Sequence, residues 1–406
     1  MRIPRVAFFT DSFHEVNGVA HTSREFENYA RGQRVPFFSL HPGRRTQAWR
    51  EEELIRYELR NSRFSFSLEV DLSFDPLFWR HTRGVLAALR EFAPDLIHIT
   101  GPGHCGILGA ILARHLRVPL VASWHTNVHE YGGRRLHKLL RFLPQSAVTP
   151  LCNWAEARML DVLLRFYRMA RLQFAPNPEL VSLLAKGTGR PCYVMTRGID
   201  TNLFTPDRRT RNDDEFVIGY VGRLSPEKDV RQFVEMERQL RDAGIENYRF
   251  LIVGDGSDRA FLAEHLHRAD LPGVLRGEEL ARAYANMDVF LFPSETDTFG
   301  NVVLEALSSG VPAIVSGGGG PQYIVQDGSS GFRAASMEDR VEALAQLYRD
   351  SALRQRMSQA ARQRAFAFSW SAVFENVYSK YGEVLGSVAE ASRTYPVQTP
   401  SPGTAY

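Results

Sequence analysis

Short runs of apolar, β-branched and aromatic residues alternate along the chain with longer segments whose apolar residues recur at helical spacing. Continuous apolar strands between helices are typical of parallel sheets that are covered on both faces. The right-handed crossover rule then arranges each series of strands as a doubly wound domain. The expected strands are Val6–Phe9, Val35–Leu40, Leu96–Ile99, Leu120–Ser123, Leu172–Ala175 and Tyr193–Met195 in a first series, and Phe216–Val221, Phe250–Val253, Val289–Phe292 and Ala313–Val315 in a second.

A polar segment of mixed charge at 201–215, TNLFTPDRRTRNDDE, separates the two series, and we interpret it as a domain linker. The predicted organisation is α/β, with one doubly wound domain at 1–200 and another at 216–368. An amphipathic final helix at 369–390 is expected to pack back on the N-terminal domain. The tail at 394–406 is rich in Pro, Ser and Thr, and we expect it to be disordered.

The second series has little room for one of its strands. Helices are expected at about Ser257–Arg268 and Glu278–Ala285, so that only Leu271–Gly277 remains between them. With a turn at each end, Val274–Arg276 leaves space for roughly three residues, against a usual strand length of ~5–6. The sequence therefore predicts a stunted strand at this point.

Composition narrows the class of protein. The 406 residues are 44% apolar and 23% charged, which suits two globular domains and excludes fibrous or generally disordered chains. A net charge of +3 gives no reason to expect a nucleic-acid partner. Only four of the 49 basic residues are lysines, so a lysine inside a motif is less easily explained as a random surface charge.

Cysteine use and hydropathy bear on the compartment. Cys105, Cys152 and Cys192 lie far apart without CxxC spacing, so no zinc site is expected, and a reducing cytoplasm is the simplest interpretation. The N-terminal apolar run breaks at Thr10 and lacks the length and cleavage pattern of a signal peptide. No stretch approaches the ~18 apolar residues of a membrane span. We expect a cytoplasmic protein.

Candidate chemistry lies in the loops that follow the strands, because ligands of parallel α/β sheets bind beyond the carboxyl ends of the strands. In the loop GRLSPEK, Arg223 and Lys228 stand five positions apart after a glycine. Two cations there could neutralise a diphosphate without a metal ion. An ordinary solvated loop explains the same pattern about equally well.

A second loop leads into DTFGNVVLE, where helical spacing begins near Gly300. The helix N-terminus offers free N–H groups to an anionic or hydroxyl-rich ligand, with Asp297 just before the helix and Glu305 in its second turn. Alternatively, Asp297 caps the helix and Glu305 is a surface residue. His125 follows another strand directly, as a structural histidine also could, and Gly18 in the first loop permits close approach of a ligand.

Beside these residues, the chain resembles glycosyltransferase family 4, the retaining transferases of GT-B fold. The resemblance extends from FFTDSFHEVNGVA to FSWSAVFENVY and is most specific in GRLSPEKDV, SETDTFGNVVLEALSSGVP, GGPQYIVQDGSSGF and RGIDTNLFTP. It implies two Rossmann-like domains that face a central cleft. Within the family, the chain looks most similar to bacterial mannosyl- and glucosyltransferases that act on lipid or cell-envelope acceptors.

The resemblance implies roles for the C-terminal residues. Arg223 and Lys228 match the pair that binds the donor diphosphate. Glu305 matches the second acid of the family's E-x7-E motif, which holds the ribose. Asp297 stands where the first glutamate usually is and would contact hydroxyls of the donor sugar with a side chain one methylene shorter.

Four further implications complete the expected site. The N–H groups of Phe299 and Gly300 would face the donor, His125 matches the histidine beside the transferred sugar, and Gly18 matches the loop glycine that lets the donor phosphates approach. Related chains have a longer segment where Leu271–Gly277 stands, and its strand end helps to hold the base. We therefore expect weakened base recognition here.

The implied reaction retains anomeric configuration. No carboxylate stands out as a nucleophile, so front-face attack is favoured, with the departing phosphate accepting the proton of the acceptor. A GDP- or UDP-sugar is the expected donor and a lipid or glycan the expected acceptor, with no metal and no cofactor apart from the donor. Segment Tyr131–Arg171 mixes arginines with apolar residues. It fits peripheral contact with the inner face of a membrane, and equally an ordinary helical pair that covers the sheet.

Three rival functions stay open on the sequence. An NAD-dependent oxidoreductase has a similar α/β pattern, but the full G-x-G-x-x-G fingerprint is missing. An epimerase or a phosphorylase could share the GT-B fold. A two-domain sugar-binding protein without chemistry would usually work outside the cytoplasm, which disagrees with the missing secretion signal.

Overall fold

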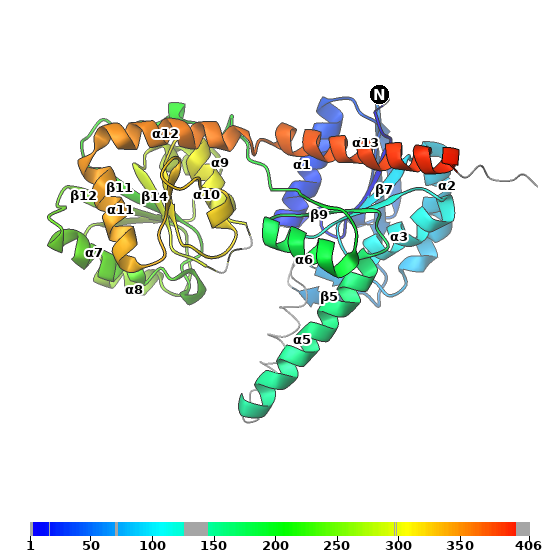
Figure 1. Cartoon of the computed structure of the whole chain (residues 1–406), viewed down its shortest axis with the longest axis horizontal. Coiled ribbons are helices and arrows are strands. Elements are labelled where there is room, and N and C mark those ends of the chain that lie inside the picture. The colour runs from blue at the N-terminus through cyan, green and yellow to red at the C-terminus, as the bar shows by residue number, and fades with distance from the viewer. Residues whose placement is uncertain are drawn as a thin grey trace, which may run out of the picture. The chain divides into compact units, whose positions relative to one another are not determined.

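The computed structural model describes residues 3–15, 17–69, 72–125, 145–295, 297 and 299–394. They form two compact units. Unit 1 contains the described residues up to Met195 and those from Phe374 onward, and unit 2 runs from Thr196 to Val373. Each unit has a mainly parallel sheet with helices packed on it (Figure 1).

The sheet of unit 1 has the strand order β10-β9-β8-β7-β1-β2-β4-β3, in which only β3 is antiparallel to its neighbour. Its strands are β1 (Val6–Phe9), β2 (Phe37–Gly43), β3 (Gln47–Glu51), β4 (Leu54–Arg60), β7 (Leu96–Ile99), β8 (Leu120–Ser123), β9 (Leu172–Ala175) and β10 (Cys192–Val194). A separate two-stranded sheet contains β5 (Phe66–Glu69) and β6 (Leu72–Phe74). The pair β3–β4 was not predicted, because every residue of β3 is exposed and charged residues interrupt β4.

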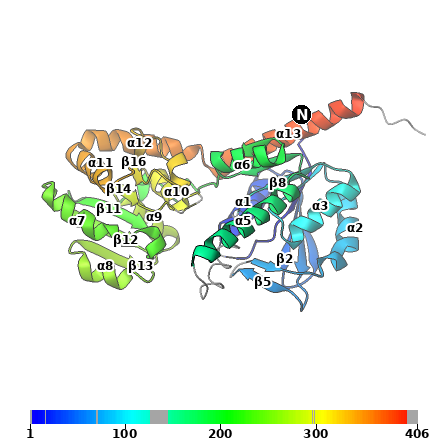
Figure 2. The same ribbon diagram turned by 60° about the horizontal axis from the view of Figure 1, so that its bottom comes forward.

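The helices of unit 1 pack on this sheet through apolar and aromatic side chains. Figure 2 shows α2 beside α3, and the two helices contact each other. Phe26 of α1 stacks on Phe374 of α13 with ring centroids 4.3 Å apart, so the part of α13 that begins at Phe374 belongs to the core of unit 1. The helices are α1 (Gly18–Gly32), α2 (Thr82–Phe92), α3 (His104–Leu116), α5 (Gln145–Tyr167), α6 (Pro178–Thr188) and α13 (Trp370–Thr394).

The sheet of unit 2 is parallel throughout, in the order β13-β12-β11-β14-β15-β16. This is the order of a dinucleotide-binding Rossmann sheet, whose ligands bind where the strand order reverses, here between β11 and β14. The strands are β11 (Phe216–Val221), β12 (Tyr248–Val253), β13 (Ala269–Gly273), β14 (Val289–Phe292), β15 (Ala313–Val315) and β16 (Gly331–Arg333). The helices are α7 (Gln232–Asp242), α8 (Arg259–His265), α9 (Gly277–Ala285), α10 (Asn301–Ser308), α11 (Met337–Arg349) and α12 (Ser351–Phe366).

The expected stunted strand at Val274–Arg276 is wrong. The strand is β13, five residues long, and it begins earlier because α8 ends at His265 and the next residue, Leu266, is already extended. The strand was not recognised in the sequence because it contains Pro272, and proline is rare inside strands. It is tolerated because β13 is an edge strand, where one N–H can be missing without breaking a ladder on both sides. Weakened base recognition is therefore no longer expected, because a strand of ordinary length lies at this position.

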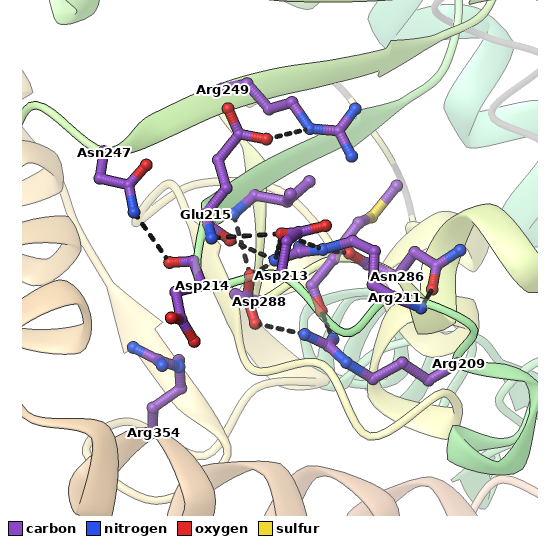
Figure 3. Close-up of polar contacts among 12 residues, drawn as sticks. Arg209, Arg211, Asp213, Asp214, Glu215, Asn247, Arg249, Asn286, Asp288 and Arg354 are labelled. Atoms are coloured by element: carbon purple, nitrogen blue, oxygen red, sulfur yellow. Dashed lines mark hydrogen bonds and ion pairs between the residues drawn. The ribbon is translucent and has the colours of Figure 1, made fainter.

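Residues 201–215 belong to unit 2 and are tied to the amino ends of its strands (Figure 3). Arg209 and Arg211 each place a guanidinium nitrogen 2.9 Å from a carboxylate oxygen of Asp288. Asp288 Oδ2 also accepts the backbone N–H of Val217 at the start of β11. The role of this segment as a linker stays a prediction. The predicted disordered tail lies outside the described residues, apart from Thr394 at the end of α13.

Candidate active site

A cavity of about 270 Å³ opens in unit 2 at the point where the strand order reverses. Loops from the carboxyl ends of β11 and β14 form most of its wall. The lining residues are Arg197, Val221, Gly222, Arg223, Lys228, Phe292, Asp297, Phe299, Gly300, Asn301 and Val302. A larger hollow of about 530 Å³ in unit 1, next to α13, contains none of the predicted site residues.

Lys228 and Asp297 form a close ion pair inside this cavity, with Lys228 Nζ 2.6 Å from Asp297 Oδ2. Their side chains are only 18% and 24% exposed. Lys228 Nζ also lies 5.9 Å from the centre of the Phe292 ring, where the π face attracts a cation. The prediction separated these two residues into a phosphate ligand and a sugar ligand, whereas the structure joins them in direct contact.

Two arginines add positive charge to the same wall. Arg223 is 72% exposed and lies 3.6 Å from Glu227, a long and solvated contact. Arg197 was not predicted as a site residue, although it opens the RGID motif. Burial lowers the pKa of Arg197, and the charge of Asp297 opposes that shift. Its place in the cavity makes it a third cation available to an anionic ligand.

The turn before α10 is shaped by Gly300. This residue is the N-cap of α10 with φ 95°, and a Cβ there would lie 2.9 Å from Pro321 Cγ. Gly300 has no side chain to cap α10, and among the described residues no side chain accepts a hydrogen bond from the first N–H groups of the helix, which leaves these groups to a ligand. The Asp297 carboxylate accepts a hydrogen bond from Lys228, and no hydrogen bond joins it to a described N–H group of α10. Phe299 is almost fully buried, so its ring anchors the turn.

Glu305 is only partly exposed, so it is not the freely solvated surface residue of the alternative interpretation. Its Oε2 accepts a hydrogen bond of 2.8 Å from the hydroxyl of Tyr284 on α9. Burial raises the pKa of Glu305 to about 7, and the Tyr284 hydrogen bond offsets part of that rise. Glu305 is not among the residues that line the cavity, although Asn301 and Val302 of the same helix are.

The two predicted residues of unit 1 lie at the carboxyl ends of its strands. Gly18 is the first residue of α1, and the side chain of Asn17 caps that helix by accepting the N–H of Ala20 at 2.9 Å. His125 follows β8, and its Nε2 lies 2.7 Å from the hydroxyl of Ser123. Both positions suit contact with a ligand at the rim of the sheet. Of the segment Tyr131–Arg171, predicted either to contact a membrane or to cover the sheet, residues 131–144 lie outside the described residues.

Comparison with known proteins gives the glycosyltransferase class that the sequence resembles. Residues 15–203 match the family model Glycosyltransferase Family 4, and residues 204–364 match Glycosyl transferases group 1. The chain is 35% identical over 317 residues to a GDP-mannose-dependent alpha-mannosyltransferase of Mycobacterium tuberculosis, an alignment that covers 74% of this chain and 76% of that protein. A protein of the same description from Mycolicibacterium smegmatis is 33% identical over 313 residues, covering 74% and 77%.

Solved structures share the fold at low sequence identity. Sucrose-phosphate synthase from Thermosynechococcus elongatus has a TM-score of 0.65 at 19% identity, covering 96% of this chain and 100% of that chain. WaaG, a glycosyltransferase involved in lipopolysaccharide biosynthesis, has a TM-score of 0.57 at 15% identity, covering 92% and 98%.

The family models and the relatives identify a glycosyltransferase that uses a nucleotide-sugar donor, and the solved structures show that its fold is GT-B. The chain belongs to glycosyltransferase family 4 and is a hexosyltransferase. The predicted fold and class are thereby confirmed, and the oxidoreductase and binding-protein alternatives fall away.

Proposed function

We propose that this enzyme transfers mannose from GDP-mannose to a hydroxyl of a lipid or glycan acceptor, with retention of anomeric configuration. The donor is inferred from the relatives described as GDP-mannose-dependent alpha-mannosyltransferases, which align over about three quarters of the chain. The observation that carries the proposal is the cationic cavity at the strand-order reversal of unit 2, which Arg197, Arg223 and Lys228 line together with the N-terminus of α10.

The cavity supports a donor-binding role for these groups. A diphosphate carries charge that two or three guanidinium and ammonium groups can neutralise without a metal ion. The N–H groups of Phe299 and Gly300 would add hydrogen bonds to the donor. Glu305 would accept the ribose hydroxyls, and Asp297 would contact the sugar.

The transfer step follows from this arrangement. The acceptor oxygen attacks the anomeric carbon from the face that the diphosphate leaves, and the bond from that carbon to the phosphate oxygen breaks. The leaving diphosphate takes the acceptor's proton, so no side chain must act as a covalent nucleophile. The protein contributes positioning and stabilisation of the charge that develops on the leaving group.

The exposed side chains of helix α5 favour the proposal that the acceptor lies at a membrane surface. Leu151, Trp154 and Val162 expose apolar side chains along it, and the Arg158 guanidinium lies 5.9 Å from the Trp154 ring centre. Cations and large apolar groups on one helix suit the interface of anionic lipids. None of the described helices combines the length and the hydropathy needed to cross a bilayer. We propose peripheral contact with the inner face of the membrane.

One experiment tests donor and acceptor in sequence. Purified protein is incubated with GDP-mannose, GDP-glucose, UDP-glucose or UDP-galactose, and released nucleoside diphosphate is measured with and without lipid and glycan acceptors. We expect the highest release with GDP-mannose, dependent on an acceptor, and an α-linked product by NMR. A preference for a UDP-sugar, or a β-linked product, would refute the proposal.

A further inference from the structure

Three side chains that were not predicted as site residues meet in unit 1. His14 lies in the loop after β1, His41 in β2 and Glu58 in β4. One ring nitrogen of each histidine and a carboxylate oxygen of Glu58 lie within 4.8 Å of one another. Their sequence spacing matches no metal-binding motif, so only the fold reveals the group.

The sheet register fixes two members of this group. His41 and Glu58 are direct partners in the parallel ladder between β2 and β4, so their side chains share a face. The loop after β1 holds the third. Phe13 of that loop stacks on the His41 ring, with centroids 3.9 Å apart and planes 2° from parallel.

His14 lies at the edge of this stack. Its ring centroid is 5.1 Å from that of His41 and 5.3 Å from that of Phe13, and its plane is nearly perpendicular to both. A ring equally distant from two stacked rings must lie beside them, not above them. From there, His14 Nε2 is 3.3 Å from Glu58 Oε1.

The hydrogen bonds around His41 leave one nitrogen open. His41 Nδ1 lies 3.1 Å from the carbonyl oxygen of Pro42, which can only accept, so Nδ1 carries the proton. Nε2 then holds a lone pair, and it is buried with no hydrogen-bond partner. A histidine whose other nitrogen donates to a carbonyl is the usual state of a metal ligand.

Glu58 is also held by a second residue in an orientation that suits a metal ligand. Gln47 Nε2 donates to its Oε2 at 2.9 Å, which orients the carboxylate and leaves Oε1 facing His14. Gly43 lies on β2 two residues beyond His41, and a Cβ there would lie 2.7 Å from the Glu58 carboxyl carbon. The glycine thus leaves the carboxylate the space it occupies.

We propose that His14, His41 and Glu58 bind a single Zn²⁺ ion, with water as the fourth ligand. Two imidazole nitrogens and one carboxylate oxygen suit Zn²⁺, whereas Mg²⁺ and Ca²⁺ prefer oxygen ligands throughout. Ligand bonds of ~2.0–2.2 Å require the three groups to draw together. His14 can supply that movement, because its side chain is 57% exposed. The ion would tie the loop after β1 to β2 and β4 and takes no part in the proposed transfer reaction.

A second cluster of similar composition among the described residues, formed by Asp11, His104 and Cys105, has no carboxylate oxygen left free for a metal ion. Both carboxylate oxygens of Asp11 already accept backbone N–H groups, from Cys105 at 2.8 Å and from Gly106 at 3.3 Å. Asp11 therefore accepts hydrogen bonds from the free N–H groups in the first turn of α3. Burial, followed by the charge of Asp11, raises the pKa of the Cys105 thiol, which opposes the thiolate that a metal needs.

The test is direct Zn²⁺ binding to the full chain after treatment with a chelator and removal of that chelator. Competition with a fluorescent zinc indicator should show one saturable site per chain. His14→Ala and Glu58→Gln should each weaken binding by at least ~10–100-fold, the range seen when even an outer partner of a metal site is removed. Co²⁺ in place of Zn²⁺ should give the visible absorption of a four-coordinate site, which both variants should lose.

The matched control is His115→Ala, which removes an exposed histidine of α3 outside the group and should leave Zn²⁺ affinity unchanged. The His14 side chain is 57% exposed, so His14→Ala is expected to fold even if a change at the buried His41 does not. Absence of one-to-one binding would overturn the proposal. Wild-type affinity in either His14→Ala or Glu58→Gln would also overturn it. None of these readouts depends on transferase activity.

Discussion

Replacing Glu305 by glutamine should make the protein more stable above pH 7 and leave its stability nearly unchanged near pH 5. Burial raises the pKa of the Glu305 carboxyl from its usual 4.5 to about 7. The folded protein therefore keeps a proton on Glu305 that the unfolded chain has already lost between these values. Stability must fall as the pH rises through this window, because the folded state binds more protons there.

The size of the effect follows from the two pKa values. Each pKa unit corresponds to about 1.4 kcal/mol, so a rise from 4.5 to about 7 costs about 3 kcal/mol once the pH is well above 7. Glutamine has nearly the same shape, carries no charge at any pH, and can still accept the hydroxyl of Tyr284. The advantage of Glu305→Gln should therefore grow from below ~1 kcal/mol at pH 5 to about 3 kcal/mol at pH 8.

Denaturant unfolding of the full chain at pH 5, 6, 7 and 8 would measure this difference, following the transition that the substitution displaces. Glu279→Gln is the matched control, because Glu279 is exposed on α9, the helix that also carries Tyr284. Tyr284→Phe should move the window to higher pH by removing the hydrogen bond that favours the ionised carboxylate. A difference between Glu305→Gln and wild type that stays constant from pH 5 to 8 would refute the reasoning.

Three further predictions concern the cavity. Lys228→Ala should weaken GDP binding by ~1.5–3 kcal/mol, the range of a charge-assisted hydrogen bond, and unchanged calorimetric affinity of the folded variant would remove the assignment. Transfer should continue in excess EDTA, because cations and a helix N-terminus are proposed to hold the diphosphate; turnover that EDTA abolishes and Mg²⁺ or Mn²⁺ restores would contradict this. Gly300→Ala should destabilise the protein by more than ~1 kcal/mol, since φ 95° and the contact with Pro321 both oppose a Cβ, and an unchanged melting temperature would count against that account.

The sequence predicted the parts of the fold that depend on continuous apolar runs. Strands such as β1 and β14 were placed at their observed residues, because strands buried on both faces leave an unbroken apolar signal. Edge elements were missed or misplaced for the opposite reason. β3 is exposed along its length, and β13 contains Pro272 and has no fully buried residue.

For the site residues, the sequence predicted what depends on local position and missed what depends on contacts between distant segments. Lys228 and Asp297 could be named because each lies in a loop directly after a strand. Their mutual contact could not, because it depends on β11 and β14 being neighbours across a reversal of strand order. Arg197 lies two residues after the predicted strand Tyr193–Met195 and directly before Gly198, so its position after a strand and the resemblance in RGID were signals that could have identified it.

The pairing of Lys228 with Asp297 carries a consequence for donor binding. A diphosphate that takes Lys228 must compete with a carboxylate 2.6 Å away, and success would free Asp297 for the sugar hydroxyls. Asp297→Asn keeps the shape and removes the competing charge. For a partly exposed pair worth about 1 kcal/mol, GDP should bind roughly fivefold more tightly to Asp297→Asn than to wild type.

Turnover with the sugar donor should fall in the Asp297→Asn variant, because an amide accepts hydroxyl hydrogen bonds less strongly than a carboxylate. Calorimetry with GDP and initial rates with GDP-mannose would separate the two effects. Weaker GDP binding by Asp297→Asn would mean that the acid organises Lys228 for the phosphate instead of withholding it.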